Sequence, residues 1–172
     1  MPDVARVVVP LVIFFIMGVL VVYLLWRVVV VGGEVRRDAA VNRAAVDLAH
    51  RVDTSLTELA GLVDDVRRRK SPPETTEASL AAATDALSHY EAEAEPMTKH
   101  KSASGAIAGL AAEIERAHRA VDLIEYGRAL MAEGSEQHFG EGETSVKRGY
   151  LNLVHAREAI RACAQQILAD AQ

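Results

Sequence analysis

The chain has very little cysteine, few aromatic residues and no large excess of charge of either sign. Cys163 is the only cysteine among 172 residues, which excludes an internal disulfide and is compatible with a reducing compartment. Aromatic residues make up 5% of the chain and hydrophobic residues 50%, a composition that favours helices packed through Ala, Val and Leu over a β-sandwich. We therefore expect an all-α fold.

The formal net charge is −5, and the basic residues are interspersed with acidic ones. Nucleic-acid-binding proteins concentrate Lys and Arg on one face or stripe, and this sequence has no such concentration. DNA or RNA is therefore not expected as a partner. The many Ala, Val and Arg residues are typical of a bacterial protein encoded by a GC-rich genome.

A long hydrophobic run follows a short N-terminal tail of residues 1–6. It covers residues 7–31 and is interrupted by a single charge, Arg27. An apolar stretch of about 20 residues matches the hydrocarbon core of a bilayer. We therefore predict one transmembrane helix with its interface within residues 7–31, and membrane lipid as a partner. A secretory signal peptide is the competing interpretation, although its hydrophobic region is shorter, about 7 to 15 residues.

The far interface of this span is predicted near Tyr23 and Trp26, because aromatic side chains gather at membrane surfaces, with Arg27 reaching the headgroups just beyond. Basic residues near a span favour the cytoplasmic side. Those on the C-terminal side are Arg27, Arg36, Arg37 and Arg43, against Arg6 on the other side. We therefore expect a single-pass protein of the cell membrane, with its N-terminus outside and its C-terminal domain in the cytoplasm.

A helical period begins after Gly32-Gly33, which we expect to form a hinge. It predicts one long amphipathic helix over residues 34–70, ended by Pro72-Pro73. The apolar positions step by threes and fours: Ala45, Ala49, Val52, Leu56, Leu59, Val63 and Val66.

Residues 71–172 contain three further stretches with a helical period. They predict helices at about 77–95, 104–133 and 143–170. We expect the second helix to end before Pro96 and residues 135–142 to form a Gly-rich connection. The apolar positions are Leu80, Ala83, Leu87, Tyr90 and Ala94; Ile107, Leu110, Ile114, Ala117, Val121, Ile124 and Met131; and Val146, Tyr150, Leu153, Ile160, Cys163 and Ile167.

These helices with short polar connections predict an antiparallel bundle of about four helices. A continuous coiled coil is the alternative, but it needs unbroken heptads, and Pro72-Pro73 and Gly140–Gly142 interrupt them. Glycine inside a helix costs about 1 kcal/mol relative to Ala, so Gly127 and Gly149 suggest close approach between helices.

Glu115 and His118 are the candidate metal ligands, because an E-x-x-H step places a carboxylate and an imidazole on one helix face, as in carboxylate-bridged di-iron bundles. The last helix offers Asn152 and His155 at the same spacing, where Asn is a poor substitute. An exposed pair of side chains is the alternative interpretation.

The candidate binding residues are Lys147, Tyr150 and His155 on the last helix and Tyr126 on the one before it. The i,i+4 spacing predicts that Tyr150 packs inward while Lys147, Leu151 and His155 share a neighbouring strip. Cys163 falls on the apolar stripe, where a buried thiol is inert. Because no catalytic or nucleotide-binding motif is present, we expect neither enzymatic activity nor a cofactor.

At the level of layout, one membrane helix followed by long helices resembles the LemA family of bacterial membrane proteins. The segment VRRDAAVNRAAVDLAHRVDTSLTELAGLV lacks the Trp and Asn-Leu-Val pattern of that family, so the resemblance implies an architecture and assigns no site residue.

The sequence thus favours a non-catalytic, membrane-anchored scaffold or adaptor whose bundle binds a protein partner or a second copy of the chain. A membrane-tethered sensor or ligand-binding bundle is the first alternative. A metal-dependent enzyme built on Glu115 and His118 is the second.

Overall fold

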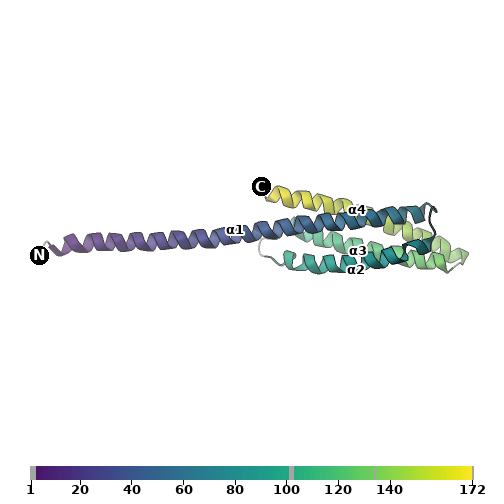
Figure 1. Cartoon of the computed structure of the whole chain (residues 1–172), viewed down its shortest axis with the longest axis horizontal. Helices are drawn as coiled ribbons and strands as arrows, with labels where there is room; N and C mark the ends of the chain where they lie inside the picture. Colours follow the sequence, from purple (N-terminus) through teal and green to yellow (C-terminus); the bar gives the residue numbers. More distant parts are fainter. Residues whose placement is uncertain (1–2, 101–102, 134, 172) are drawn as a thin grey trace. The chain divides into compact units, whose positions relative to one another are not determined.

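The computed structural model describes the backbone of residues 3–100, 103–133 and 135–171, and these residues form helices and no strand (Figure 1). The side chains of residues 3–16, 28–35, 73 and 137 lie outside the description. Where side chains are described, no helix is long and apolar enough to cross a membrane. Within the predicted span at residues 7–31, the side chains of residues 7–16 and 28–31 lie outside this description.

The chain divides into two compact units, Met1–Ala40 and Val41–Gln172. Helix α1, Asp3–Arg67, contributes to both. The second unit adds a short 3-10 helix η1, Pro73–Thr76, followed by α2, Glu77–Thr98, α3, Gly105–Ala132, and α4, Glu136–Asp170.

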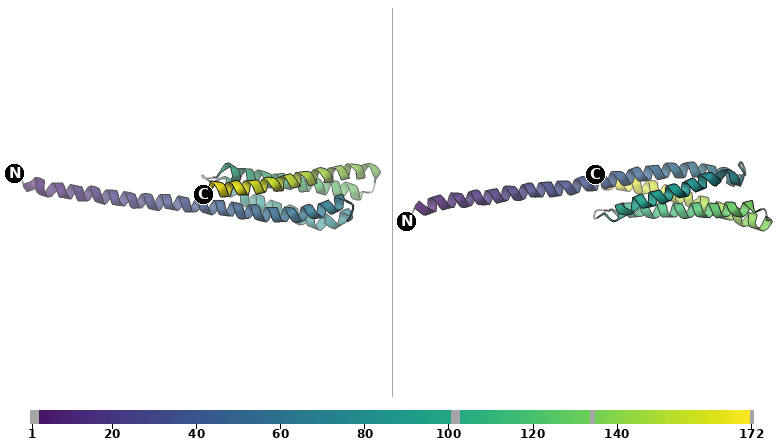
Figure 2. Two further views of the ribbon diagram at one scale, coloured as in Figure 1. Left: turned by 90° about the horizontal axis from the view of Figure 1, so that it is seen from above. Right: turned by 60° about the horizontal axis from the view of Figure 1, so that its bottom comes forward.

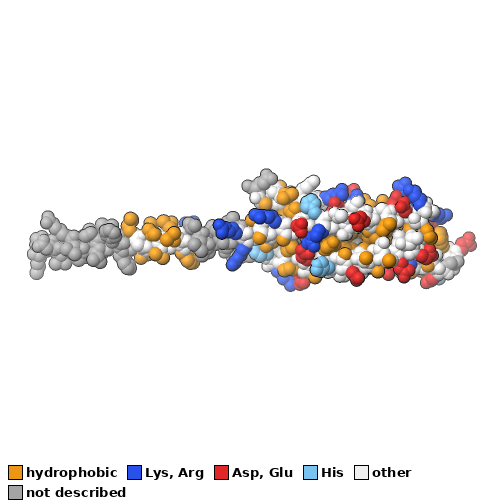
Figure 3. Space-filling view, viewed as in Figure 1, with side chains coloured by type: hydrophobic (Ala, Val, Ile, Leu, Met, Phe, Trp, Pro, Cys, Tyr) orange, Lys and Arg blue, Asp and Glu red, His pale blue; other side chains and the backbone are white. Residues whose placement is uncertain are grey.

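In the first unit, side chains are described for residues 17–27 and from Arg36 onward. Every residue from 17 to 27 is exposed, and Figure 3 shows hydrophobic side chains open to view along this stretch. The exposed fractions run from 47% at Leu24 to 66% at Val22. This part of α1 is therefore apolar around its circumference, without the polar face of a helix lying on a protein core.

The second unit is an antiparallel bundle, with α2, α3, α4 and the last part of α1 side by side in all the ribbon views (Figures 1 and 2). Contacts between residues give the order around it, because α1 touches α2 and α4, and α3 touches α2 and α4. The joining contacts are Ser55 with Tyr90, Asp53 with Arg161, Glu91 with His118, and Gly127 with Gly142. The predicted helical bundle is confirmed.

The core of the bundle follows the predicted stripes. Every position predicted on the first amphipathic helix, from Ala45 to Val66, is buried, as are those on α3 from Ile107 to Ile124. The partly buried members of the predicted set pack against this core: Ala83, Tyr90, Met131, Tyr150 and Cys163. A spacing of three and four therefore identified the inward face of all four helices.

The first amphipathic helix differs from the prediction at both ends. Gly32 and Gly33 do not interrupt α1, because glycine weakens a helix without removing a backbone hydrogen-bond donor. The C-terminal end lies at Arg67 rather than Lys70. Arg69 there has φ 58°, and the amide of Lys70 donates to the carbonyl of Asp65 at 2.8 Å, which closes the last turn.

Pro96 does not stop α2, which continues to Thr98. A proline leaves the carbonyl four residues before it without its helical donor, and here that residue is the exposed Ala92, where water can replace the lost amide. The last turn gains a bond because the Thr98 hydroxyl donates to the carbonyl of Glu95 at 2.8 Å.

The predicted connection over residues 135–142 is mostly helical, because α4 begins at Glu136. The Ser135 side chain accepts a hydrogen bond from the His138 amide at 3.2 Å and so caps the first turn. Gly140 and Gly142 lie inside α4 and do not reverse the chain. The helix boundary predicted at residue 143 was therefore wrong by about two turns.

Gly127, Gly142 and Gly149 lie where α3 and α4 meet. A Cβ built on Gly127 would lie 2.6 Å from the Gly142 carbonyl oxygen, and one on Gly149 would lie 2.9 Å from the Ala120 carbonyl oxygen. Real Cβ atoms do not approach backbone atoms this closely. The predicted close approach at Gly127 and Gly149 is confirmed.

Candidate functional site

The strip predicted on the last helix lies on the surface of α4. Lys147, Leu151 and His155 are all exposed, with Leu151 48% exposed. Tyr150 instead packs partly buried against the core, and the Arg67 guanidinium carbon lies 5.1 Å from its ring centroid. The predicted orientations are confirmed, and the role of the strip as a binding surface stays a prediction.

Tyr126 does not join Tyr150 in one site. It lies on α3, is 51% exposed, and its hydroxyl donates to Glu141 Oε1 at 3.4 Å. Tyr150 contacts Arg67 of α1, so the two rings face different neighbours. None of the three pockets described below is lined by either tyrosine, by Lys147 or by His155.

Glu115 and His118 have separate partners. The Glu115 carboxylate accepts a hydrogen bond from Arg119 on the same helix, whereas His118 Nδ1 lies 2.9 Å from Glu91 Oε1 on α2. The described residues include no group of three or more His, Cys, Asp or Glu side chains able to hold a metal ion. The two side chains therefore do not share a site, because His118 contacts α2 and Glu115 bonds within its own helix.

Cys163 lies half-buried on α4, facing α3. Its sulfur lies 3.3 Å from the place where a Cβ on Gly109 would stand. Burial raises the pKa of the Cys163 thiol, and the nearby Glu113 carboxylate adds to the increase. A raised pKa lowers the thiolate fraction at neutral pH, which fits the expected inert thiol.

Charged side chains join α1 to its neighbours across the bundle surface. The Arg161 Nε donates to Asp53 Oδ1 at 2.8 Å, and Arg157 lies 4.0 Å from the same oxygen. Arg51 donates to Glu93 on α2, which together with its bond to Asp47 raises the pKa of its guanidinium. These pairs were not predicted, because sequence spacing reveals ion pairs within a helix but not those between helices.

Two open grooves run along α2. The groove beside α1 has a volume of about 260 Å³, and its lining includes Glu58, Leu59, Leu62 and three alanines. The groove beside α3, of about 500 Å³, carries Glu91, Glu95 and Glu115. Each of these glutamates already has a side-chain partner: Glu91 contacts His118, Glu95 pairs with Lys99 and Glu115 pairs with Arg119.

A third pocket, of about 250 Å³, lies at the end of the bundle where α1 ends and α3 turns into α4. Its lining combines apolar and cationic side chains: Val66, Arg69, Lys70, Ser71, Pro72, Met131 and Phe139. Two sequence features could have indicated this pocket, namely the basic run Arg67–Lys70 and Phe139, the only Phe after residue 15. Neither could be connected to the other, because the two segments meet only in the folded bundle.

Comparison of the chain with protein-family models, curated proteins and solved structures gives no match. The LemA-like layout accordingly stays a resemblance of architecture, and function has to be argued from the residues.

Proposed function

We propose that this protein is a non-catalytic, single-pass membrane-anchored scaffold, which holds a four-helix bundle at the membrane surface for interaction with other proteins. The observation that carries the proposal is the exposed apolar stretch of α1 from Met17 to Trp26. A helix that is apolar on all sides is stable in lipid or in the interior of a large protein, not in water.

The sequence extends this stretch to a length that suits a bilayer. Residues 7–26 contain no charged side chain, and about 20 such residues span the hydrocarbon core. Tyr23 and Trp26 end the run, and Arg27 follows them. The basic residues after the span favour a cytoplasmic bundle, with the N-terminus outside.

The bundle supplies surfaces suited to protein partners. An alanine-lined groove between α1 and α2 accepts side chains of another helix, and the exposed leucines nearby and on α4 offer apolar contacts: Leu62, Leu151 and Leu168. Interaction through such surfaces needs no catalytic group.

Membrane fractionation of the full chain tests the anchor. Wild-type protein should stay in the membrane pellet after alkaline carbonate washing, whereas Leu20→Asp with Leu24→Asp should release it, because each Asp costs about 2.5–3.5 kcal/mol in the middle of a span. The matched control is Leu62→Asp with Leu168→Asp, which changes two exposed leucines of the bundle and should leave the chain in the pellet. Release of the wild-type chain by carbonate would contradict the proposal.

The scaffold role is tested by gentle extraction of the tagged chain from its native membrane after crosslinking, with identification of whatever remains bound. A stoichiometric second protein supports the proposal. Recovery of the chain alone counts against it and shifts weight to the sensor alternative.

Protease protection tests the proposed orientation. Protease added to intact spheroplasts should leave the bundle uncut, and cleavage there would reverse the proposed orientation.

A further inference from the structure

The pocket at the end of the bundle, which we call the end pocket, is lined by residues from three helices. Val66 comes from α1, Met131 from α3 and Phe139 from α4, while Arg69 and Lys70 come from the turn after α1. Val66 is buried whereas Arg69 and Lys70 are exposed, so the floor toward the core is apolar and the edge toward solvent is cationic. This combination favours a ligand with an apolar group attached directly to an anion.

The size of the end pocket limits that ligand. Its volume of about 250 Å³ lies just below the range of roughly 300–1,000 Å³ found for drug-sized ligands. It suits one large side chain with its terminal carboxylate rather than a long acyl chain or an extended peptide. Arg69 and Lys70 are 70% and 61% exposed in their side chains, so a ligand can reach them from solvent.

Arg69 has bonding capacity left over. Its Nη2 lies 3.5 and 3.4 Å from the two carboxylate oxygens of Glu143, whereas charge-assisted hydrogen bonds usually measure about 2.7–2.9 Å. Its guanidinium carbon also lies 5.7 Å from the ring centroid of Phe139, which keeps the cation beside the apolar floor.

Lys70 is held equally loosely, with its Nζ 3.4 Å from Asp65 Oδ1. Glu143 and Asp65 are the carboxylates paired with these two cations, and their side chains are 46% and 48% exposed. Solvent screens such exposed pairs, so an incoming carboxylate with better geometry can replace them.

The backbone conformation of Arg69 also supports a binding role for its side chain. Its φ of 58° is a conformation that glycine adopts without penalty and that other residues adopt at a cost. A helix ending in this geometry usually carries glycine there. The presence of a long cationic side chain at this position is explained if that side chain has a ligand to bind.

We propose that the end pocket binds the C-terminal residue of a partner polypeptide, with its carboxylate at Arg69 and Lys70 and its apolar side chain against Phe139 and Met131. This names a class of partner for the proposed scaffold but rests on the bundle alone, so failure of the membrane anchor would leave it standing.

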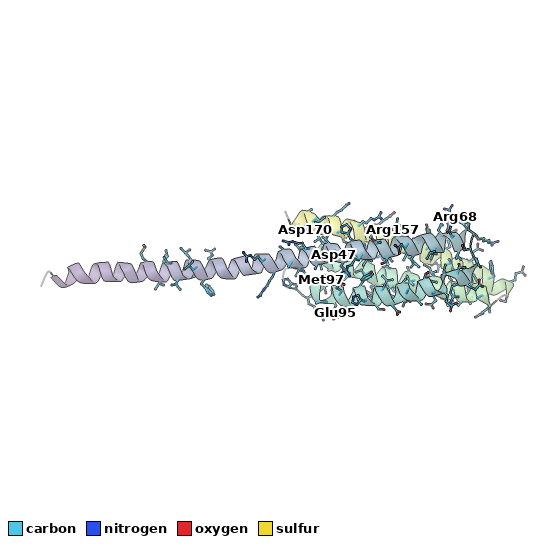
Figure 4. All side chains as sticks on the ribbon, in the orientation of Figure 1. Asp47, Arg68, Glu95, Met97, Arg157 and Asp170 are labelled. Carbon is cyan, nitrogen blue, oxygen red and sulfur yellow. The ribbon has the colours of Figure 1, made fainter. Side chains whose placement is uncertain are left out.

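Methyl NMR of the full-length chain tests the proposal, because the sequence has four methionines and Met131 lines the pocket. The chain is labelled with ¹³C at its methionine methyl groups and titrated with the peptide Gly-Ser-Gly-Ser-Gly-Phe, first with a free C-terminal carboxylate and then amidated. Only the Met131 signal should shift. Met97 serves as an internal control. It lies at the opposite end of the bundle from Arg68, the neighbour of the pocket residue Arg69 (Figure 4).

The free peptide should bind at least about tenfold more tightly than the amidated one, since the amide loses the charge-assisted bonds. Arg69→Gln removes the positive charge, and because Gln is no better suited than Arg to a positive φ, the backbone strain stays the same. It should weaken binding of the free peptide by about tenfold. Arg68→Gln is the matched control, because Arg68 pairs with Asp64 at 2.6 Å and does not line the pocket; it should change the affinity less than twofold.

An unshifted Met131 signal at millimolar peptide would overturn the proposal. Equal affinity for the free and amidated peptides would also overturn it, since the carboxylate would then have no role. Equal weakening by Arg68→Gln and Arg69→Gln would show general attraction to a basic cluster and not a pocket. If 3-phenylpropionate binds as tightly as the peptide, the ligand is a small acid and the assignment to a polypeptide is wrong.

Discussion

At the scale of single residues, glycine determines how closely α3 and α4 approach each other. A Cβ on Gly142 would lie 2.5 Å from the Gly127 carbonyl oxygen and 2.7 Å from Met131 Cγ, while one on Gly149 would lie 2.6 Å from Ile124 Cγ1. Gly140 is different, because nothing lies within 4 Å of the position its Cβ would take. The same residue type therefore has a packing role at one position in α4 and none two residues earlier.

We predict opposite effects for two Gly→Ala substitutions. Gly127→Ala should lower the free energy of unfolding by about 1–3 kcal/mol, because backbone atoms of α4 must move to admit the methyl group. Gly140→Ala, in open space on an exposed part of a helix, should raise it by up to about 1 kcal/mol through helix propensity. Urea denaturation of both variants measures this, and equal effects would mean that α3 and α4 are farther apart than described.

At the scale of the elements, the helices differ in how firmly the core holds them. The buried residues described for α2 are Leu80, Leu87 and Ala94, one in every seven, whereas α3 buries nine residues. Open grooves lie on both sides of α2. Because burial of apolar surface supplies most of the stability of a helix in a bundle, α2 should be the most weakly held.

Hydrogen exchange should show this difference. We expect the amides of α2 to exchange faster than those of α3, because local opening of α2 exposes less apolar surface. Leu87→Ala should speed exchange mainly in α2, whereas Leu110→Ala, which removes an equally buried leucine from α3, should speed it throughout the bundle. If all the helices exchange at one common rate in the unmodified protein, α2 is part of a single cooperative unit and the prediction fails.

The prolines and glycines that were predicted to interrupt helices do not all do so. Pro72-Pro73 lie in the predicted break after the first amphipathic stretch, but α1 already ends at Arg67, where Arg69 takes a positive φ, and the short helix η1 begins at Pro73. Pro96, Gly140 and Gly142 were assigned the same role and do not have it. A proline in the last turn leaves only one carbonyl without its helical donor, and a glycine keeps its own backbone donor, so neither has to end a helix.

At the scale of the whole molecule, the chain consists of two units that differ in how far their apolar side chains are buried. The described core extends from Ala45 to Ile167 and so lies entirely in Val41–Gln172. The exposed apolar stretch from Met17 to Trp26 lies in the other unit. Folding of the bundle should therefore not depend on the N-terminal unit.

A fragment of residues 41–172 tests this independence. Its circular dichroism should show a helical protein with cooperative thermal unfolding, and its melting temperature should lie within about 5 °C of the bundle transition in the full chain, a shift that corresponds to roughly 1 kcal/mol. A fragment without cooperative unfolding would show that residues 1–40 contribute to the stability of the bundle. The anchor proposal would be unaffected by that result.

The sequence by itself determined the helical class, the inward faces of the four helices and the inward orientation of Tyr150 and Cys163. These features follow from a period of 3.6 residues, which acts within one helix and can be counted along the chain. It also supplied the apolar run at residues 7–26, which underlies the proposed anchor.

Only the tertiary structure decided which residues meet across helices. It paired Asp53 with Arg161 and His118 with Glu91, and it brought Phe139 beside Arg69 in the end pocket. It also turned Gly142 from an apparent break into a packing residue. The physical reason is that these contacts depend on the register and closeness of neighbouring helices, which are set by the packing of the whole core and have no local signature in the sequence.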